Sequence, residues 1–120
     1  MAQGGRLTTH VLDLVRGCPA CGLGIELYRI EGAERVHLAS LFTNADGRLD
    51  QPLLEEEAFL AGTYELVFRA GDYLRAEHIQ VGKPLFLEEI PVRFAVTDAS
   101  RHYHVPLLLS AYGYSTYRGS

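Results

Sequence analysis

The sequence predicts an all-β fold, a sandwich of two antiparallel sheets with one short helix. Three observations support this prediction. Apolar side chains recur at every second residue in many short stretches, clusters of Gly, Pro, Asn and Asp separate these stretches, and only one segment has the spacing of a helix. The 120 residues are enough to bury one core, so we expect a single domain over residues 1–120.

Three strands are expected in the first part of the chain. Residues 8–14 are β-branched and apolar and stop before the loop that contains Gly17. Residues 23–28 alternate Leu and Ile with Gly, Glu and Tyr, and residues 36–43 end at the turn formed by residues 44–47. Alternation of this kind predicts strands with one face in the core.

The next segment combines a strand with the expected helix. Residues 63–69 alternate Tyr, Leu and Phe with Glu, Val and Arg, which is the pattern of a half-buried strand. Residues 71–78 predict a helix of about two turns. We expect the Asp72 side chain to cap its start, with Leu74 and His78 on one side of it.

The last part of the chain predicts three further strands. Residues 88–97 alternate apolar and other side chains, and Pro91 among them indicates a sheet edge or a bulge, because proline cannot donate to a neighbouring strand. Residues 102–110 alternate throughout, and residues 113–117 offer one more short strand. Many short strands and frequent turns complete the pattern of a two-sheet sandwich.

The strand expected at residues 102–110 has two unequal faces. One is apolar enough for the core and consists of Tyr103, Val105, Leu107 and Leu109. The other mixes polar and apolar groups and consists of His102, His104, Pro106 and Leu108. The same mixture recurs at Thr8, His10 and Leu12 in the first strand and at Ser115 and Tyr117 in the last. Such faces predict contact with a ligand or with another subunit.

Histidines on these faces suit acid–base chemistry. Each imidazole alone is explained by an ordinary hydrogen bond, but two near one cleft can take a proton from water and return one to a leaving nitrogen. His102 and His104 also have the spacing of strand-borne metal ligands, although that strand offers no third ligand, so we expect no metal. The turn at residues 46–48 projects the Arg48 guanidinium, which suits a urea-like or anionic ligand or, alternatively, plain solvent. His37 is expected on ordinary surface.

Composition and charge exclude several other classes of function. The formal net charge is −4 with no basic stripe, which argues against a nucleic-acid partner. No apolar run is long enough to cross a bilayer, and the start lacks the apolar segment of a secretion signal, so we expect a cytoplasmic protein without membrane contact. Cys18 and Cys21 lie in a Gly/Pro loop, where two small reduced residues are a simpler interpretation than a redox motif.

Two terminal motifs and a central turn resemble the signatures of a known family. The chain ends in the run HYHVPLLLSAYGYSTYRGS at residues 102–120, which resembles the C-terminal signature of the 5-hydroxyisourate hydrolases, enzymatic relatives of transthyretin. Near the start it contains LTTHVLD at residues 7–13, followed by Gly17 and Pro19, which is similar to the N-terminal signature of the family. The run NADGR at residues 44–48 matches the central turn. The resemblance spans the whole chain and implies a transthyretin-like β-sandwich.

The resemblance also implies an activity and a set of site residues. It implies hydrolysis of 5-hydroxyisourate, an unstable product of urate oxidation, to 2-oxo-4-hydroxy-4-carboxy-5-ureidoimidazoline, without any cofactor. The implied catalytic residues are His10, Arg48 and His104. The implied substrate-binding residues are Tyr117, Arg118, Gly119 and Ser120. Tyr117 and Ser120 are expected nearest to the substrate. Strand alternation agrees independently, because it places His10, His104 and Tyr117 opposite the better core candidates.

The assembly implied by the resemblance is a homotetramer, a dimer of dimers with the sites at the dimer–dimer interface. The outward face is partly apolar, which is consistent with its being covered by another subunit in such an assembly. Two alternatives remain open: a transthyretin-like carrier that only binds a small aromatic ligand, and a metal-binding module that uses His10, His102 and His104. The chain departs from the usual family pattern at Ala111, where Pro is usual, and at its cysteine pair.

Overall fold

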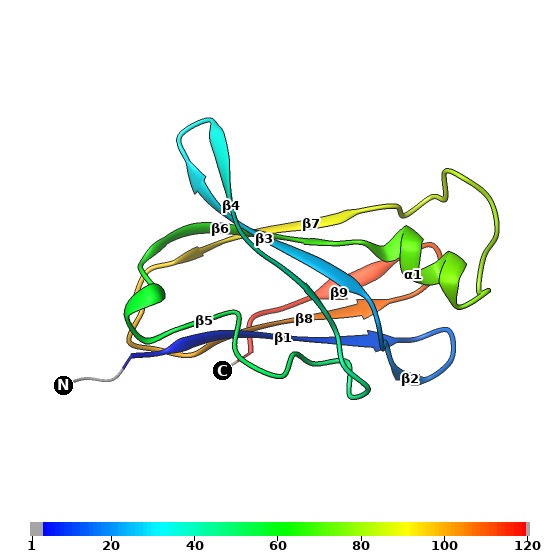
Figure 1. Ribbon diagram of the computed structural model, residues 1–120, viewed down its shortest axis with the longest axis horizontal. Helices are drawn as coiled ribbons and strands as arrows, with labels where there is room; N and C mark the ends of the chain where they lie inside the picture. The colour runs from blue at the N-terminus through cyan, green and yellow to red at the C-terminus, as the bar shows by residue number, and fades with distance from the viewer. Residues whose placement is uncertain (1–3, 120) are drawn as a thin grey trace.

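The computed structural model describes residues 4–119, and its strands form two stacked sheets, as predicted (Figure 1). The first sheet has the order β2 (Cys18–Pro19), β1 (Arg6–Asp13), β8 (Tyr103–Leu109), β9 (Tyr114–Thr116), with β5 (Leu54–Glu55) also paired to β1. The second sheet has the order β4 (Glu34–Phe42), β3 (Gly24–Glu31), β6 (Gly62–Phe68), β7 (Ile90–Val96). Two short helices complete the described chain, the 3-10 helix η1 (Glu56–Ala58) and the α-helix α1 (Ala70–Ala76).

One strand pair departs from the antiparallel pattern. β1 and β8 run parallel, whereas the other strand pairs in the described chain are antiparallel. Local alternation predicts each strand but not the direction in which distant strands pair. The parallel register places Thr8 beside His104 and His10 beside Pro106, so the mixed faces of the two strands form one continuous surface.

The opposite faces of β1 and β8 contribute to the core. Their inward side chains are at most 6% exposed and comprise Leu7, Thr9, Val11, Asp13, Tyr103, Val105, Leu107 and Leu109. The core face predicted for residues 102–110 is therefore confirmed. Full burial of one large apolar side chain contributes about 1.5–3 kcal/mol, so this face holds the first sheet firmly against the second.

A buried carboxylate ties the end of β1 to α1. Asp13 is 1% exposed and accepts a hydrogen bond of 2.7 Å from the Tyr73 hydroxyl and one of 3.1 Å from Nε of Arg16. Burial alone would raise the pKa of Asp13, but the hydrogen bonds from Tyr73 and Arg16 outweigh it and hold that pKa below its usual value. This network fixes the loop after β1.

The helix differs in detail from its prediction. It spans Ala70–Ala76 rather than residues 71–78, and the predicted cap by Asp72 is wrong. The cap position is Arg69, so Asp72 already lies inside the first turn, where its carboxylate pairs with Arg75 at 3.0 Å. His78 lies beyond the helix with a φ of 58°, so it does not share a helical face with buried Leu74.

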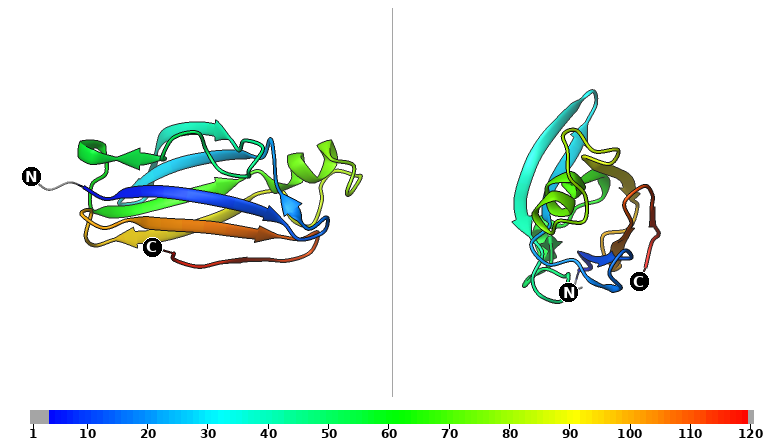
Figure 2. Two further views of the ribbon diagram at one scale, coloured as in Figure 1. Left: turned by 90° about the horizontal axis from the view of Figure 1, so that it is seen from below. Right: turned by 90° about the vertical axis from the view of Figure 1, so that its right-hand side faces the viewer.

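The edges of the sheets position the end of the chain. β7 is an edge strand, which confirms the interpretation of exposed Pro91. Figure 2 shows the C-terminal segment returning alongside β8 toward the start of β1.

None of the helices in residues 4–119 is long and apolar enough to cross a membrane.

Candidate functional site

A cavity lies on the outer surface of β1 and β8, where the two mixed faces meet. Its volume is about 480 Å³, within the range of pockets that bind small organic molecules. The residues that line it come from both strands and from the segment that follows the central turn: Arg6, Thr8, Thr9, Arg48, Leu49, Asp50, Gln51, Pro52, His102 and His104. Two guanidinium and two imidazole groups thus border one small cavity.

The central turn holds Arg48 at the cavity by its own hydrogen bonds. The Asn44 side-chain oxygen accepts from the backbone N–H of Asp46 at 2.9 Å and of Arg48 at 3.1 Å. Gly47 has a φ of 75°, and its carbonyl accepts from the N–H of Val11 at 2.8 Å. A Cβ at this position would collide with the carbonyl oxygen of Val11, so glycine allows the turn to dock on β1.

The same turn orients the first predicted catalytic histidine. Nε2 of His10 lies 2.9 Å from the carbonyl oxygen of Asp46. A carbonyl only accepts, so the His10 Nε2 carries a proton, and Nδ1 is the bare nitrogen of the neutral ring. His10 and Arg48 are therefore positioned by one short piece of backbone.

His104, the second predicted histidine, lies across the strand pair from a hydroxyl. Its Nδ1 is 2.8 Å from Oγ1 of Thr8. The pKa of His104 is lowered from its usual value, first by burial and then by the charge of Arg48 and by His10. The imidazole is thus neutral at neutral pH and able to accept a proton.

The C-terminal segment is paired with β8 at this histidine. The N–H of Gly119 donates to the carbonyl of His104 at 2.7 Å, and the N–H of His104 donates to the carbonyl of Gly119 at 3.3 Å. Gly119 packs directly on the imidazole, because a Cβ there would lie 3.2 Å from both Cβ and Cδ2 of His104. The guanidinium of Arg118 lies 4.0 Å over the Tyr103 ring and donates to the carbonyl of His102 at 3.1 Å.

The other predicted terminal residues lie elsewhere. Tyr117 is 59% exposed and, with Arg118, lines a second hollow of about 270 Å³ between β7 and the end of the chain. Neither of them lines the cavity that contains Arg48 and His104. Ser120, predicted nearest to the substrate, falls outside the described residues. Within one chain the structure therefore brings His10, Arg48, His104 and Gly119 together and leaves Tyr117 apart.

Most residues that line the cavity were not among the predicted site, including Thr8 and His102. Strand alternation placed Thr8 on the mixed face of β1 with His10 but assigned it no role. His102 precedes β8 and also lines the cavity; alternation placed it on the mixed face with His104, and only the metal-binding alternative gave it a role. Among residues 4–119, no three side chains of His, Cys, Asp or Glu are arranged to hold a metal, so that alternative lacks a ligand set there.

Comparison with known proteins identifies a family match over most of the chain. The family described as HIUase/Transthyretin matches residues 7–119. A protein of Rhizobium meliloti (strain 1021) named 5-hydroxyisourate hydrolase 2 is 59% identical over 120 residues, which is all of both chains. A 5-hydroxyisourate hydrolase of Mesorhizobium japonicum is 60% identical over 99% of this chain and 95% of its own.

Solved structures of two kinds share the fold. The 5-hydroxyisourate hydrolase of Klebsiella pneumoniae has a TM-score of 0.79 and 33% identity, with 97% of this chain and 99% of that chain covered. Sea bream transthyretin in complex with thyroxine has a TM-score of 0.84 and 28% identity, with 95% and 94% covered. These similarities confirm the predicted sandwich, and the higher sequence identities are to proteins named as hydrolases.

Proposed function

The chain belongs to the HIUase/Transthyretin family, as its terminal motifs predicted, and from this membership we propose that it hydrolyses 5-hydroxyisourate in urate degradation. The predicted enzyme class, a hydrolase, is that of the Rhizobium meliloti and Mesorhizobium japonicum relatives. The observation that carries the proposal is the shared outer face of β1 and β8, where Arg48 and His104 border one cavity and His10 adjoins it. The proposed product is 2-oxo-4-hydroxy-4-carboxy-5-ureidoimidazoline.

The proposed mechanism uses side chains alone. One imidazole takes a proton from water as the water oxygen attacks the ring carbonyl. The carbon–nitrogen bond then breaks, the departing nitrogen receives the same proton back from the imidazolium, and the carboxylic acid that forms releases its own proton to solvent. His104 suits this role because its lowered pKa keeps it neutral, and His10 is oriented beside it by the carbonyl of Asp46. No cofactor or metal takes part in this scheme.

Arg48 has a distinct role in the proposal. The tetrahedral intermediate carries a negative oxygen, and a guanidinium on a rigid turn is a preorganised partner for it. A donor placed toward such an oxyanion is worth about 3 kcal/mol in comparable hydrolases. From the family resemblance we also assign substrate contacts to Tyr117, Arg118, Gly119 and Ser120, although Tyr117 and Arg118 line the second hollow of their own chain.

We further propose one domain that assembles as a homotetramer, a dimer of dimers with its sites at the dimer–dimer interface. Two outward side chains support this assembly, because Leu12 and Leu108 are register partners on the outer face and are only partly buried, whereas Pro106 on the same face is already buried within one chain. A second copy over this face would close the open cavity and exclude water. Light scattering should give four times the mass of one chain, and an active monomer would contradict the arrangement.

The experiment that tests the function follows the absorbance of freshly made 5-hydroxyisourate with and without the protein. We expect its decay to be much faster with the protein than in buffer. Thyroxine-like or other aromatic ligands bound without faster decay would instead support a carrier, the function for which the likeness to sea bream transthyretin argues. Activity that survives a strong chelator would argue against a metal-dependent reaction.

A further inference from the structure

The hydroxyl of Thr8 has a place in the site that the catalytic set leaves unexplained. We propose that Thr8 is a positioning residue: its oxygen accepts the Nδ1 proton of His104 and thereby leaves Nε2 of that ring as the nitrogen that takes the proton from water. This inference rests on the proposed hydrolysis.

The backbone fixes the contact between these two side chains. Thr8 and His104 are register partners in the parallel pair of β1 and β8, so their Cα atoms are held by the sheet itself. Oγ1 and Nδ1 are 2.8 Å apart, and both residues line the cavity. The hydroxyl of Thr9, the next residue, donates to the carbonyl of Val105 at 2.7 Å, so of these two neighbouring hydroxyls that of Thr8 is the one that meets His104.

The proposed role of His104 as the base determines the direction of the hydrogen bond. A neutral imidazole has one N–H, and it accepts only at its other nitrogen. Within residues 4–119, Nε2 of His104 has no hydrogen-bond partner, whereas Nδ1 is already engaged by Thr8. For Nε2 to take a proton, the proton of the neutral ring must lie on Nδ1, so the oxygen of Thr8 must accept it.

This direction also serves the charged form of the ring. When Nε2 gains a proton, Nδ1 keeps its own, so the bond to Thr8 persists and strengthens without any rotation of the hydroxyl. The opposite direction would require the hydroxyl to turn during the reaction. Gly119 supplies the second constraint, because its backbone packs on the imidazole and restricts its swing.

The two histidines are therefore held in opposite tautomers. His10 carries its proton on Nε2, which faces the carbonyl of Asp46. His104 carries its proton on Nδ1, which faces Thr8. Each ring thus presents a different nitrogen to the substrate, and the split is set by one backbone carbonyl and one hydroxyl.

The test combines two substitutions with the wild type. Thr8→Val removes the hydroxyl at nearly constant volume, and Thr8→Ser keeps it. Loss of one such hydrogen bond should lower kcat for 5-hydroxyisourate about tenfold with little change in KM. Thr8→Ser should restore most of the rate. Thr63→Val, the same change in β6 of the other sheet, is the matched control and should leave the rate unchanged.

The pH profile distinguishes an accepting from a donating hydroxyl. An acceptor stabilises the imidazolium, so Thr8→Val should lower the pKa of His104 and move the acid limb of kcat/KM to lower pH. Movement to higher pH would overturn the proposal, because it would mean that Thr8 donates to the neutral ring. An unchanged kcat in a folded Thr8→Val protein would also overturn it.

A spectroscopic measurement on the wild type is independent of folding of the variants and of the activity. Long-range ¹⁵N–¹H NMR of the His104 ring at neutral pH should show the proton on Nδ1. A proton on Nε2 would overturn the proposal. A wild type that fails to accelerate decay of 5-hydroxyisourate refutes the proposed function, while the tautomer of His104 is still read directly.

Discussion

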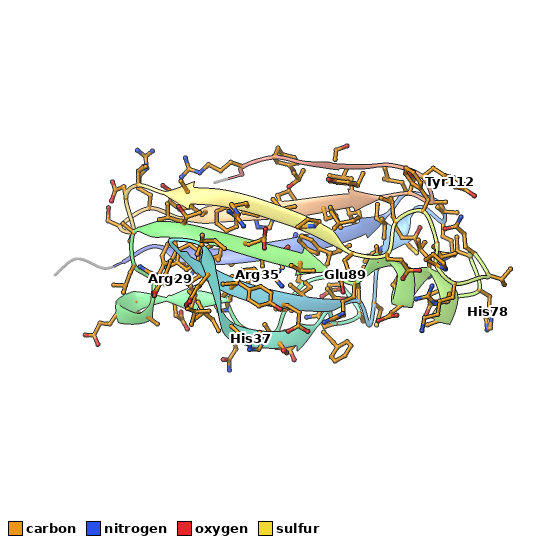
Figure 3. All side chains as sticks on the ribbon, turned by 90° about the horizontal axis from the view of Figure 1, so that it is seen from above. Arg29, Arg35, His37, His78, Glu89 and Tyr112 are labelled. Atoms are coloured by element: carbon orange, nitrogen blue, oxygen red, sulfur yellow. The ribbon has the colours of Figure 1, made fainter. Side chains whose placement is uncertain are left out.

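The outer faces of the two sheets hold histidines in opposite surroundings. On the second sheet, Nε2 of His37 lies 2.8 Å from Glu26 and 2.9 Å from Ser40. Figure 3 shows His37 and Arg35 on the hairpin formed by β3 and β4. On the first sheet, the side-chain partner of His104 is a hydroxyl rather than a carboxylate.

The arginines follow the same contrast. Arg35 and Arg93 both pair with Glu65, at 3.1 and 3.5 Å. Arg69 pairs with Glu26 at 3.3 Å. Arg48 is held by its backbone, which leaves its guanidinium at the cavity.

The difference shows what distinguishes the site. Its polar side chains are available to a ligand, and this matters more than how many of them there are. Hydrogen bonds from Ser40, His37 and Arg69 hold the pKa of Glu26 below its usual value, so that carboxylate stays ionised and paired. Burial and the charge of Arg48 lower the pKa of His104, so that imidazole stays neutral and free to react. On the outer face of the second sheet the charged side chains pair with one another, whereas on the first sheet Arg48 borders the cavity where a ligand can bind.

The largest expected effect is that of removing the free guanidinium. Arg48→Ala should lower kcat about 10²–10³-fold, because the oxyanion loses its preorganised donor. The melting temperature should change little, since the side chain is exposed. Arg35→Ala, the matched change on the outer face of the second sheet, should leave kcat unchanged. Steady-state kinetics with a thermal melt measures both, and an unchanged kcat in Arg48→Ala would remove it from the mechanism.

Deletion of the last four residues should have a comparable but smaller effect. It removes the strand-like pairing of Gly119 with His104 and the contact of Arg118 with Tyr103. Misplacement of a catalytic group by about 1 Å can cost about a hundredfold in rate. Circular dichroism should show a folded protein, and near-wild-type activity of that protein would refute a role for the C-terminal segment.

A single methyl group at the same place gives a milder test. Gly119→Ala puts a Cβ 3.2 Å from the His104 side chain, so the ring must shift, and we expect about a tenfold loss of kcat. Gly113→Ala is the control, because its Cβ would meet only the Ser110 hydroxyl at 3.7 Å. Equal rates for the two variants would show that Gly119 does not hold the imidazole.

The smallest effect is expected on the outer face of the second sheet, where the charged side chains form ion pairs. The folded pKa of Glu26 is depressed, so its contribution to stability is present above the pKa of the unfolded chain and is lost as the pH falls through the folded pKa. Glu26→Gln should therefore reduce stability at neutral pH by about 1 kcal/mol or less, and the difference should vanish in acid. Melting temperatures against pH check this, and kcat should not change.

The sequence predicted the fold and much of the site because alternation reports which side of a strand a residue occupies. Tyr103, Val105 and Leu107 were assigned to the core, and His104 to the outer face, from period-two spacing alone. The parallel pairing of β1 with β8 could not be predicted, because register between distant strands depends on the whole packing. The hydrogen bond between His104 and Thr8 depends on that register.

Residues at the ends of strands were predicted with mixed success. His102 precedes the first residue of β8 and lines the cavity on the side to which alternation assigned it. Tyr117 follows the short strand β9, and its backbone course after that strand carries it to the second hollow. The ends of elements are where sequence patterns constrain side chains least.

The most direct test of the two faces compares two histidine variants in one assay. Decay of freshly made 5-hydroxyisourate is followed with equal amounts of wild type, His104→Asn and His37→Asn. We predict rapid decay with the wild type and with His37→Asn, and a rate close to that of buffer with His104→Asn. Wild-type decay with a folded His104→Asn protein, or no acceleration by the wild type, would contradict the assignment of the β1 and β8 face as the catalytic site.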